Sequence, residues 1–222
     1  FNEDCYVNLG DYALFAQSWL TCNDPLNPNC ATPVVSNVLR VDFNGYNAED
    51  ASSFDNVAAT AAMPGLLGDG TFWNGLEVSY ATPNTISAVY PGPALLLEDG
   101  VTDSQVSIAL SGFDLADFFA SANLVYKDYL LDTIAPIEAT VTISGLVPGN
   151  SYNLAGYGSN GDAGYGAVWS ANGSDPLNLS SGVFQGVIPD VVADSSGVIT
   201  IQLTGPEYNI IIANGFELEG TF

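Results

Sequence analysis

An alternation of apolar and polar residues runs through most of the chain from residue 34 onward and predicts β-strands. Turn-forming pairs such as Pro148-Gly149 and Asn172-Gly173 separate the alternating runs. About ten short strands are expected: Val38–Phe43, Leu76–Tyr80, Ala94–Glu98, Gln105–Ser111, Ala139–Ser144, Tyr152–Tyr157, Ala167–Ala171, Gly182–Val187, Val198–Leu203 and Asn209–Glu217. Residues 50–63 and 113–122 are candidates for short helices between strands. The pattern predicts a mainly β fold, a jelly-roll β-sandwich of about eight to ten strands.

The first 32 residues follow a different, helical pattern. Asn8 is placed to cap a helix over residues 9–20, and Asp11 in its first turn complements the helix dipole. Four large apolar side chains recur on one face of this helix: Tyr12, Phe15, Trp19 and Leu20. A helix of this length is marginal alone, so it is expected to pack on another surface. We therefore expect an N-terminal arm, residues 1–32, followed by a jelly-roll domain, residues 33–222.

Three cysteines, Cys5, Cys22 and Cys30, all lie in the arm. Their clustering in an acidic, lysine-poor chain indicates an oxidising, extracellular setting. Three cysteines allow one disulfide in three pairings, with one thiol left over. The stiff, proline-containing loop between Cys22 and Cys30 favours that pair, and the other pairings stay open.

The charge of the chain restricts its functions. It has 25 acidic residues, two basic residues and no histidine, for a formal net charge of −23. Without a basic patch it is not expected to bind nucleic acid, and without histidine it has no Ser-His-Asp or Cys-His catalytic centre. No run of about 18 uninterrupted apolar residues predicts a membrane span. Because 47% of the residues are apolar, a packed core is expected rather than a disordered acidic tail.

Carboxylates are the remaining catalytic acids and bases. Four of them lie near the ends of predicted strands: Asp42, Glu77, Glu98 and Asp99. A glycoside hydrolase needs one protonated and one ionised carboxyl group at a fixed distance, and the spacing of these four selects no pair. We therefore expect a non-catalytic protein.

The segment from Asn2 to Asp11, followed by residues 12–20, resembles one half of a dockerin-type calcium module, a loop and then a helix. The resemblance implies four calcium ligands in the arm: Asn2, Asp4, Asn8 and Asp11. Cys5 stands where such loops usually have glycine, and only one of the two halves of a dockerin is present.

A second resemblance covers most of residues 37–219. Residues 41–45, 141–152, 157–161 and 214–218 resemble the galactose-binding-like jelly rolls of large secreted bacterial proteins, which bind glycans or serve as structural modules. A jelly roll with an aromatic N-terminal arm is also similar to protomers of extracellular bacterial fibrils, in which the arm docks onto the next subunit.

Two kinds of ligand are expected from these patterns. Calcium prefers carboxylate and amide oxygens. Asp42 and Asn44 cluster at the end of the first strand, and the jelly-roll resemblance places Glu217 on a neighbouring strand, so calcium is expected there or in the arm. Three aromatic residues are candidate stacking platforms for a glycan: Trp73, Tyr165 and Trp169. The two tryptophans could equally fill the sandwich core.

The sequence thus favours a secreted, non-catalytic structural subunit that assembles head-to-tail into an extracellular fibre, a helical homopolymer, through its N-terminal arm. Head-to-tail contacts do not close on themselves, so they generate filaments. The alternative is a carbohydrate-binding module of a larger extracellular enzyme, with glycans as the partner.

Overall fold

The computed structural model describes residues 37–47, 65–68, 72–80, 86–90, 95–118, 128–133, 137–158, 165–180, 182–205 and 210–222. The chain divides into two compact units, Phe1–Val35 and Ser36–Phe222, and every described residue belongs to the second. The predicted arm helix, its apolar face and the Cys22–Cys30 pair therefore lie outside the described residues, as does the candidate helix in residues 50–63.

The described residues form fourteen strands in three sheets, and they contain no helix. The five-stranded sheet has the order β11 (Gln185–Val192), β8 (Ser151–Tyr157), β14 (Gly215–Glu219), β1 (Val38–Asn47), β2 (Asn74–Tyr80). The six-stranded sheet has the order β10 (Leu177–Leu179), β9 (Ala167–Ala171), β12 (Val198–Thr204), β7 (Glu138–Ser144), β4 (Ser107–Phe113), β3 (Ile86–Tyr90). A small sheet has the order β13 (Ile211–Ala213), β6 (Asp128–Asp132), β5 (Leu115–Phe118). The β1–β2 pair is parallel, and the other strand pairs are antiparallel.

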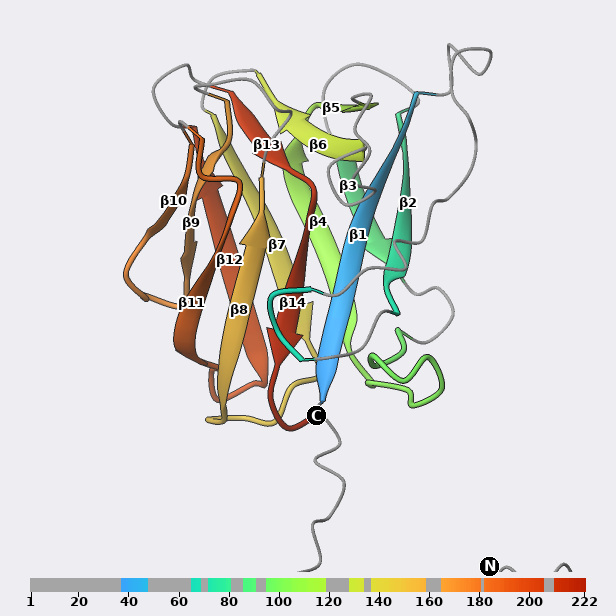
Figure 1. Cartoon of the computed structure of the whole chain (residues 1–222), viewed down its shortest axis with the longest axis vertical. Helices are drawn as coiled ribbons and strands as arrows, with labels where there is room; N and C mark the ends of the chain where they lie inside the picture. Colours follow the sequence, from blue (N-terminus) through green and yellow to red (C-terminus); the bar gives the residue numbers. More distant parts are fainter. Residues whose placement is uncertain are drawn as a thin grey trace, which may run out of the picture. The chain divides into compact units, whose positions relative to one another are not determined.

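The two larger sheets face each other and bury one apolar core between them (Figure 1). Alternation places every second residue in this core because successive side chains of a strand point to opposite faces. Three residues of β7 are buried in this way: Ala139, Val141 and Ile143. The five-stranded sheet contributes Leu39, Val41 and Phe43 of β1 in the same manner. The mainly β, sandwich-like fold predicted from the alternating pattern is therefore confirmed.

The structure corrects the sequence analysis at several elements. Residues 115–118, within a stretch expected to be helical, form β5 and pair with β6. In place of the strand expected at Ala94–Glu98, Leu96 and Leu97 make isolated bridges, and a turn begins at Glu98. The strand expected at Asn209–Glu217 is divided between two sheets, because the chain leaves the small sheet at Asn214 and joins the five-stranded sheet as β14.

A second, smaller apolar cluster lies on the outer face of the five-stranded sheet, the face turned away from the sandwich core. Its members come from two strands and from the segment around residues 65–73: Val38, Ala155, Tyr157, Leu67 and Trp73. The segment 65–68 thus covers part of the outer face, and it encloses the polar cluster described next.

Candidate functional site

Arg40 lies at the centre of a buried polar cluster on this outer face. Its neighbours Leu39 and Val41 point into the sandwich core, so Arg40 points to the opposite side. Its guanidinium donates from Nη1 to Glu98 Oε2 at 3.0 Å and from Nε to Glu217 Oε2 at 3.1 Å. Nη2 donates to the carbonyl oxygen of Leu67. Arg40 is 0% exposed, so one of the two basic residues of the chain is used entirely inside the fold.

Glu217 connects Arg40 to the covering segment 65–68. It stands directly opposite Arg40 in the β1–β14 register. Its Oε1 accepts from the backbone N–H of Leu66 at 2.6 Å and from the hydroxyl of Tyr157. Its Oε2 accepts from the backbone N–H of Leu67 at 3.1 Å as well as from Arg40. Both carboxylate oxygens are therefore satisfied by the chain itself.

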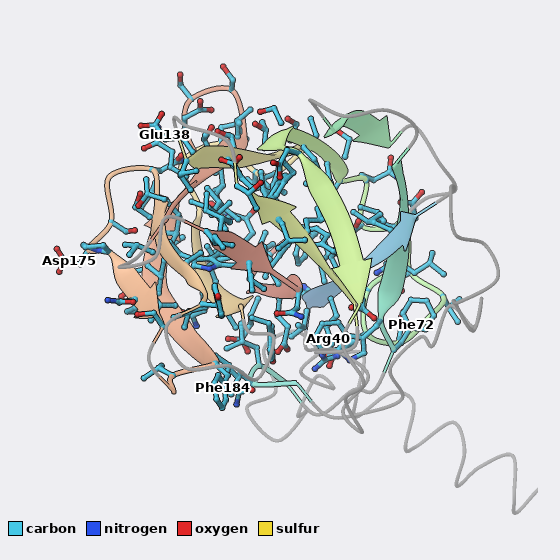
Figure 2. All side chains as sticks on the ribbon, turned by 90° about the horizontal axis from the view of Figure 1, so that it is seen from above. Arg40, Phe72, Glu138, Asp175 and Phe184 are labelled. Carbon is cyan, nitrogen blue, oxygen red and sulfur yellow. The ribbon has the colours of Figure 1, made fainter. Side chains whose placement is uncertain are left out.

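Three further residues make this arrangement specific. Gly65 leaves room for the carboxylate of Glu217, which would have to shift if a Cβ were added at that position. The side-chain amide of Asn74 donates to the carbonyl oxygens of Arg40 and Leu96, each at 2.8 Å. The Trp73 ring packs edge-on against Tyr157, with 5.6 Å between ring centroids. Figure 2 shows Arg40 and Phe72 on one side of the molecule and Glu138 on the opposite side.

We call the cluster of Arg40, Glu98, Glu217 and the backbone of residues 66–67 the Arg40 clamp. A buried guanidinium and two carboxylates are costly to desolvate unless each is paired and hydrogen-bonded, and that condition is met here by Glu98, Glu217 and the backbone of residues 66–67. The ion pairs and the hydrogen bonds together attach the segment 65–68 to the sheet.

The candidate catalytic carboxylates occupy different environments. Glu98 is bound to Arg40. Asp99 lies in an exposed turn, and hydrogen bonds from the Thr102 hydroxyl and from the backbone N–H groups of Thr102 and Val101 hold its pKa below the usual value. A general acid needs the opposite, a raised pKa. The side chain of Glu77 lies outside the described residues.

The structure also places the candidate calcium ligands. Glu217 does not fit a calcium site, because Arg40 already supplies the positive charge and both carboxylate oxygens accept hydrogen bonds. Asp42, which is 1% exposed, lies opposite Gly215 on β14 and Gly75 on β2. In the described part of the chain no three acidic or cysteine side chains are grouped to hold a metal ion. The side chain of Asn44 lies outside that part, and so do four arm positions: Asn2, Asp4, Asn8 and Asp11.

The aromatic candidates for glycan contact are not equivalent. Trp73 and Trp169 are both 0% exposed. A stacking platform must offer a ring face to solvent, so both tryptophans serve the two apolar clusters instead. Tyr165 is half-buried and stays a prediction. The predicted subunit-interface residues lie outside the described residues: Tyr12, Phe15, Trp19 and Leu20.

Comparison of the chain with models of protein families, with curated proteins and with solved structures finds no match. Among the described residues, no helix has the length and apolar character needed to cross a membrane.

Sequence reasoning missed the clamp, although one signal was available. Arg40 stands in the middle of an apolar run predicted as a strand, in a chain with only one other basic residue. A buried arginine requires acidic partners, which made Glu217, between Phe216 and Leu218, a natural candidate. The roles of Glu98, Tyr157 and the backbone of Leu66 depend on contacts between distant segments, and no local pattern indicates them.

Proposed function

We propose that the protein is a non-catalytic, extracellular structural subunit that assembles head-to-tail into a fibre through its N-terminal arm. The observation that carries the proposal is the division of the chain into two compact units. The second unit has an apolar core of its own, with residues from β1 to β14. The arm would bind another subunit through Tyr12, Phe15, Trp19 and Leu20.

We propose in addition that the second unit has jelly-roll topology. The antiparallel sheets and the pairing of first and last strands, β1 with β14, are compatible with this topology.

Electrostatic repulsion between subunits is the main effect that opposes assembly. Subunits with a net charge of −23 repel each other, so contacts between them have to be largely uncharged, screened by salt or bridged by a cation. Calcium bound in the dockerin-like loop of the arm would reduce this repulsion. Assembly is therefore expected to be favoured by calcium and by physiological salt, and to weaken in low-salt solutions that contain a chelator.

Deletion of residues 1–32 tests the proposal. The truncated protein is expected to keep its β circular dichroism and cooperative unfolding, because it retains all fourteen described strands and the apolar core between them, and to sediment as a monomer. The intact chain is expected to form large assemblies at the same concentration in calcium and salt. An unfolded truncated protein, or an intact chain that stays monomeric at high concentration, would contradict the proposal.

Carbohydrate binding is the less supported alternative. Two of its three aromatic candidates are buried, so of these three only Tyr165 could serve as a stacking platform. A polysaccharide that retains the intact protein on a gel, and releases it after Tyr165→Ala, would revive this alternative.

A further inference from the structure

Two Asn-x-Ser sequences, the acceptor sequence for N-linked glycans, lie close together in the chain. They begin at Asn172 and at Asn178, and neither has proline at its middle position. No other Asn-x-Ser or Asn-x-Thr occurs in the sequence. In sequence terms the two are equivalent. The structure describes both, and it gives their side-chain amides different roles.

The amide of Asn172 is fully used inside the fold. Its Nδ2 donates to the carbonyl oxygens of Val192 and Val198, at 2.8 Å and 2.9 Å. Its Oδ1 accepts from the backbone N–H of Thr200 at 2.9 Å. These hydrogen bonds join the residue that follows β9 to β11 and β12. A sugar on Nδ2 would replace one of its two hydrogens, so at least one of these bonds would be lost.

The amide of Asn178 is only half used. The residue is exposed in the middle of β10, and its neighbours Leu177 and Leu179 pack on the sandwich core, so its side chain points to the opposite face of the sheet. Its Oδ1 accepts from the hydroxyl of Ser180 at 2.6 Å. Within the described part of the chain, its Nδ2 donates no hydrogen bond. The nitrogen that would carry a glycan is therefore not needed to hold the fold.

β10 also lies where a bulky group can be accommodated. It is the last strand of the six-stranded sheet, so one of its sides pairs with β9 and the other pairs with no described strand. Figure 2 shows Asp175, in the loop that leads into β10, projecting away from the sheets. An uncovered edge strand invites pairing with another chain, and natural proteins protect such edges. A glycan on Asn178 would protect this edge.

We propose that Asn178 is a site of N-glycosylation and that Asn172 is a structural residue. The proposal rests on the extracellular location that is part of the proposed function, because these acceptor sequences are used in secreted proteins. In the transfer, the amide nitrogen of Asn178 attacks the anomeric carbon of an oligosaccharide carried on a lipid pyrophosphate. A C–N bond forms, and the bond from that carbon to the pyrophosphate oxygen breaks. The lipid pyrophosphate leaves, and a base of the transferase takes one amide proton.

Site mapping on the full chain tests the proposal. The chain is produced in a secretory host that transfers N-glycans, and the folded, secreted fraction is digested and analysed by mass spectrometry. A peptide N-glycosidase, which releases the glycan and leaves an aspartate, marks the modified position. The occupancy of Asn178 is expected to exceed that of Asn172 at least about tenfold, because a chain modified at Asn172 loses a hydrogen bond inside the fold.

Three variants of the acceptor sequences provide the controls. Ser180→Ala is expected to abolish modification of Asn178, whereas Ser180→Thr, which keeps a hydroxyl, is expected to preserve it. Ser174→Ala removes the acceptor sequence of Asn172 and is expected to leave the glycan on Asn178 unchanged. Circular dichroism checks that each secreted variant is folded. A bare Asn178 in the folded, secreted chain, or a glycan mainly on Asn172, would overturn the proposal.

Failure of this proposal can be distinguished from failure of the proposed function. A bare Asn178 in a chain that still assembles through its arm would refute only the glycosylation site. A chain that carries the glycan on Asn178, but stays monomeric in calcium and salt even after glycosidase treatment, would refute only the assembly.

Discussion

Replacing Arg40 with methionine is expected to destabilise the sandwich unit by about 3–5 kcal/mol. The change leaves Glu217 buried among the N–H groups of residues 66–67 and without the positive charge that pairs with it, and it leaves Glu98 without its ion pair. Removing one partner of a buried pair costs more than the pair itself contributes, because an uncompensated charge stays in the interior. Urea unfolding of the intact chain at neutral pH would give the difference in free energy.

Two comparison variants show whether this loss comes from the buried charge. Adding Glu217→Gln to Arg40→Met removes the uncompensated charge and keeps one of the two acceptor oxygens that receive the N–H groups of Leu66 and Leu67, so the double variant is expected to recover part of the loss. Glu138→Gln removes the same negative charge as Glu217→Gln, but at an exposed position, and is expected to cost less than about 0.5 kcal/mol. If Arg40→Met cost no more than Glu138→Gln, the claim that the ion pairs of Arg40 stabilise the sandwich unit would be wrong.

Replacing Trp169 with alanine is the second large effect, an expected loss of about 3–5 kcal/mol. The indole is fully buried in the main core and lies against Gly156, where an added Cβ would come within 3.0 Å of the ring. Removing it leaves a cavity between the two sheets that close packing cannot fill. The thermal midpoint and the urea midpoint should fall together.

The same substitution separates a core residue from a binding platform. An exposed apolar residue such as Val101, which is 80% exposed, should lose less than about 1 kcal/mol on replacement by alanine, which makes Val101→Ala the control. Within the described residues the Trp169 indole N–H has no hydrogen-bond partner, so Trp169→Phe should cost less than Trp169→Ala. A Trp169→Ala protein of unchanged stability that had lost affinity for a glycan would contradict the core assignment.

Much of the sandwich could be predicted because its strands bury one face each. β8 and β12 were predicted to within one residue, because both are bounded by turn residues and β12 alternates along its whole length. β5 was not predicted, because a short apolar run fits a helix as well as a strand and only its pairing with β6 decides. β10, of three residues, is too short to show a period.

The outer face of the five-stranded sheet was harder to predict than the core. Asp42 and Glu217 suggested a cation between neighbouring strands, and β1 and β14 do pair. The positive charge beside Glu217 is not a metal ion but the side chain of Arg40. A search for oxygen ligands of calcium does not consider an arginine. The tryptophans could not be assigned from sequence, since burial depends on which segment covers them, and Trp73 is covered together with Leu67 on the outer face.

Electron microscopy of mixtures of the intact chain with the chain lacking residues 1–32 tests head-to-tail assembly most directly. If the arm binds to the sandwich unit of the next subunit, the truncated chain can accept an arm but has none to insert, so it ends the fibre. In calcium and physiological salt, a small fraction of truncated chain is therefore expected to shorten the fibres in proportion to its amount, and truncated chain alone is expected to form none. Fibres of unchanged length at every mixing ratio, or fibres formed by the truncated chain alone, would contradict assembly through the arm.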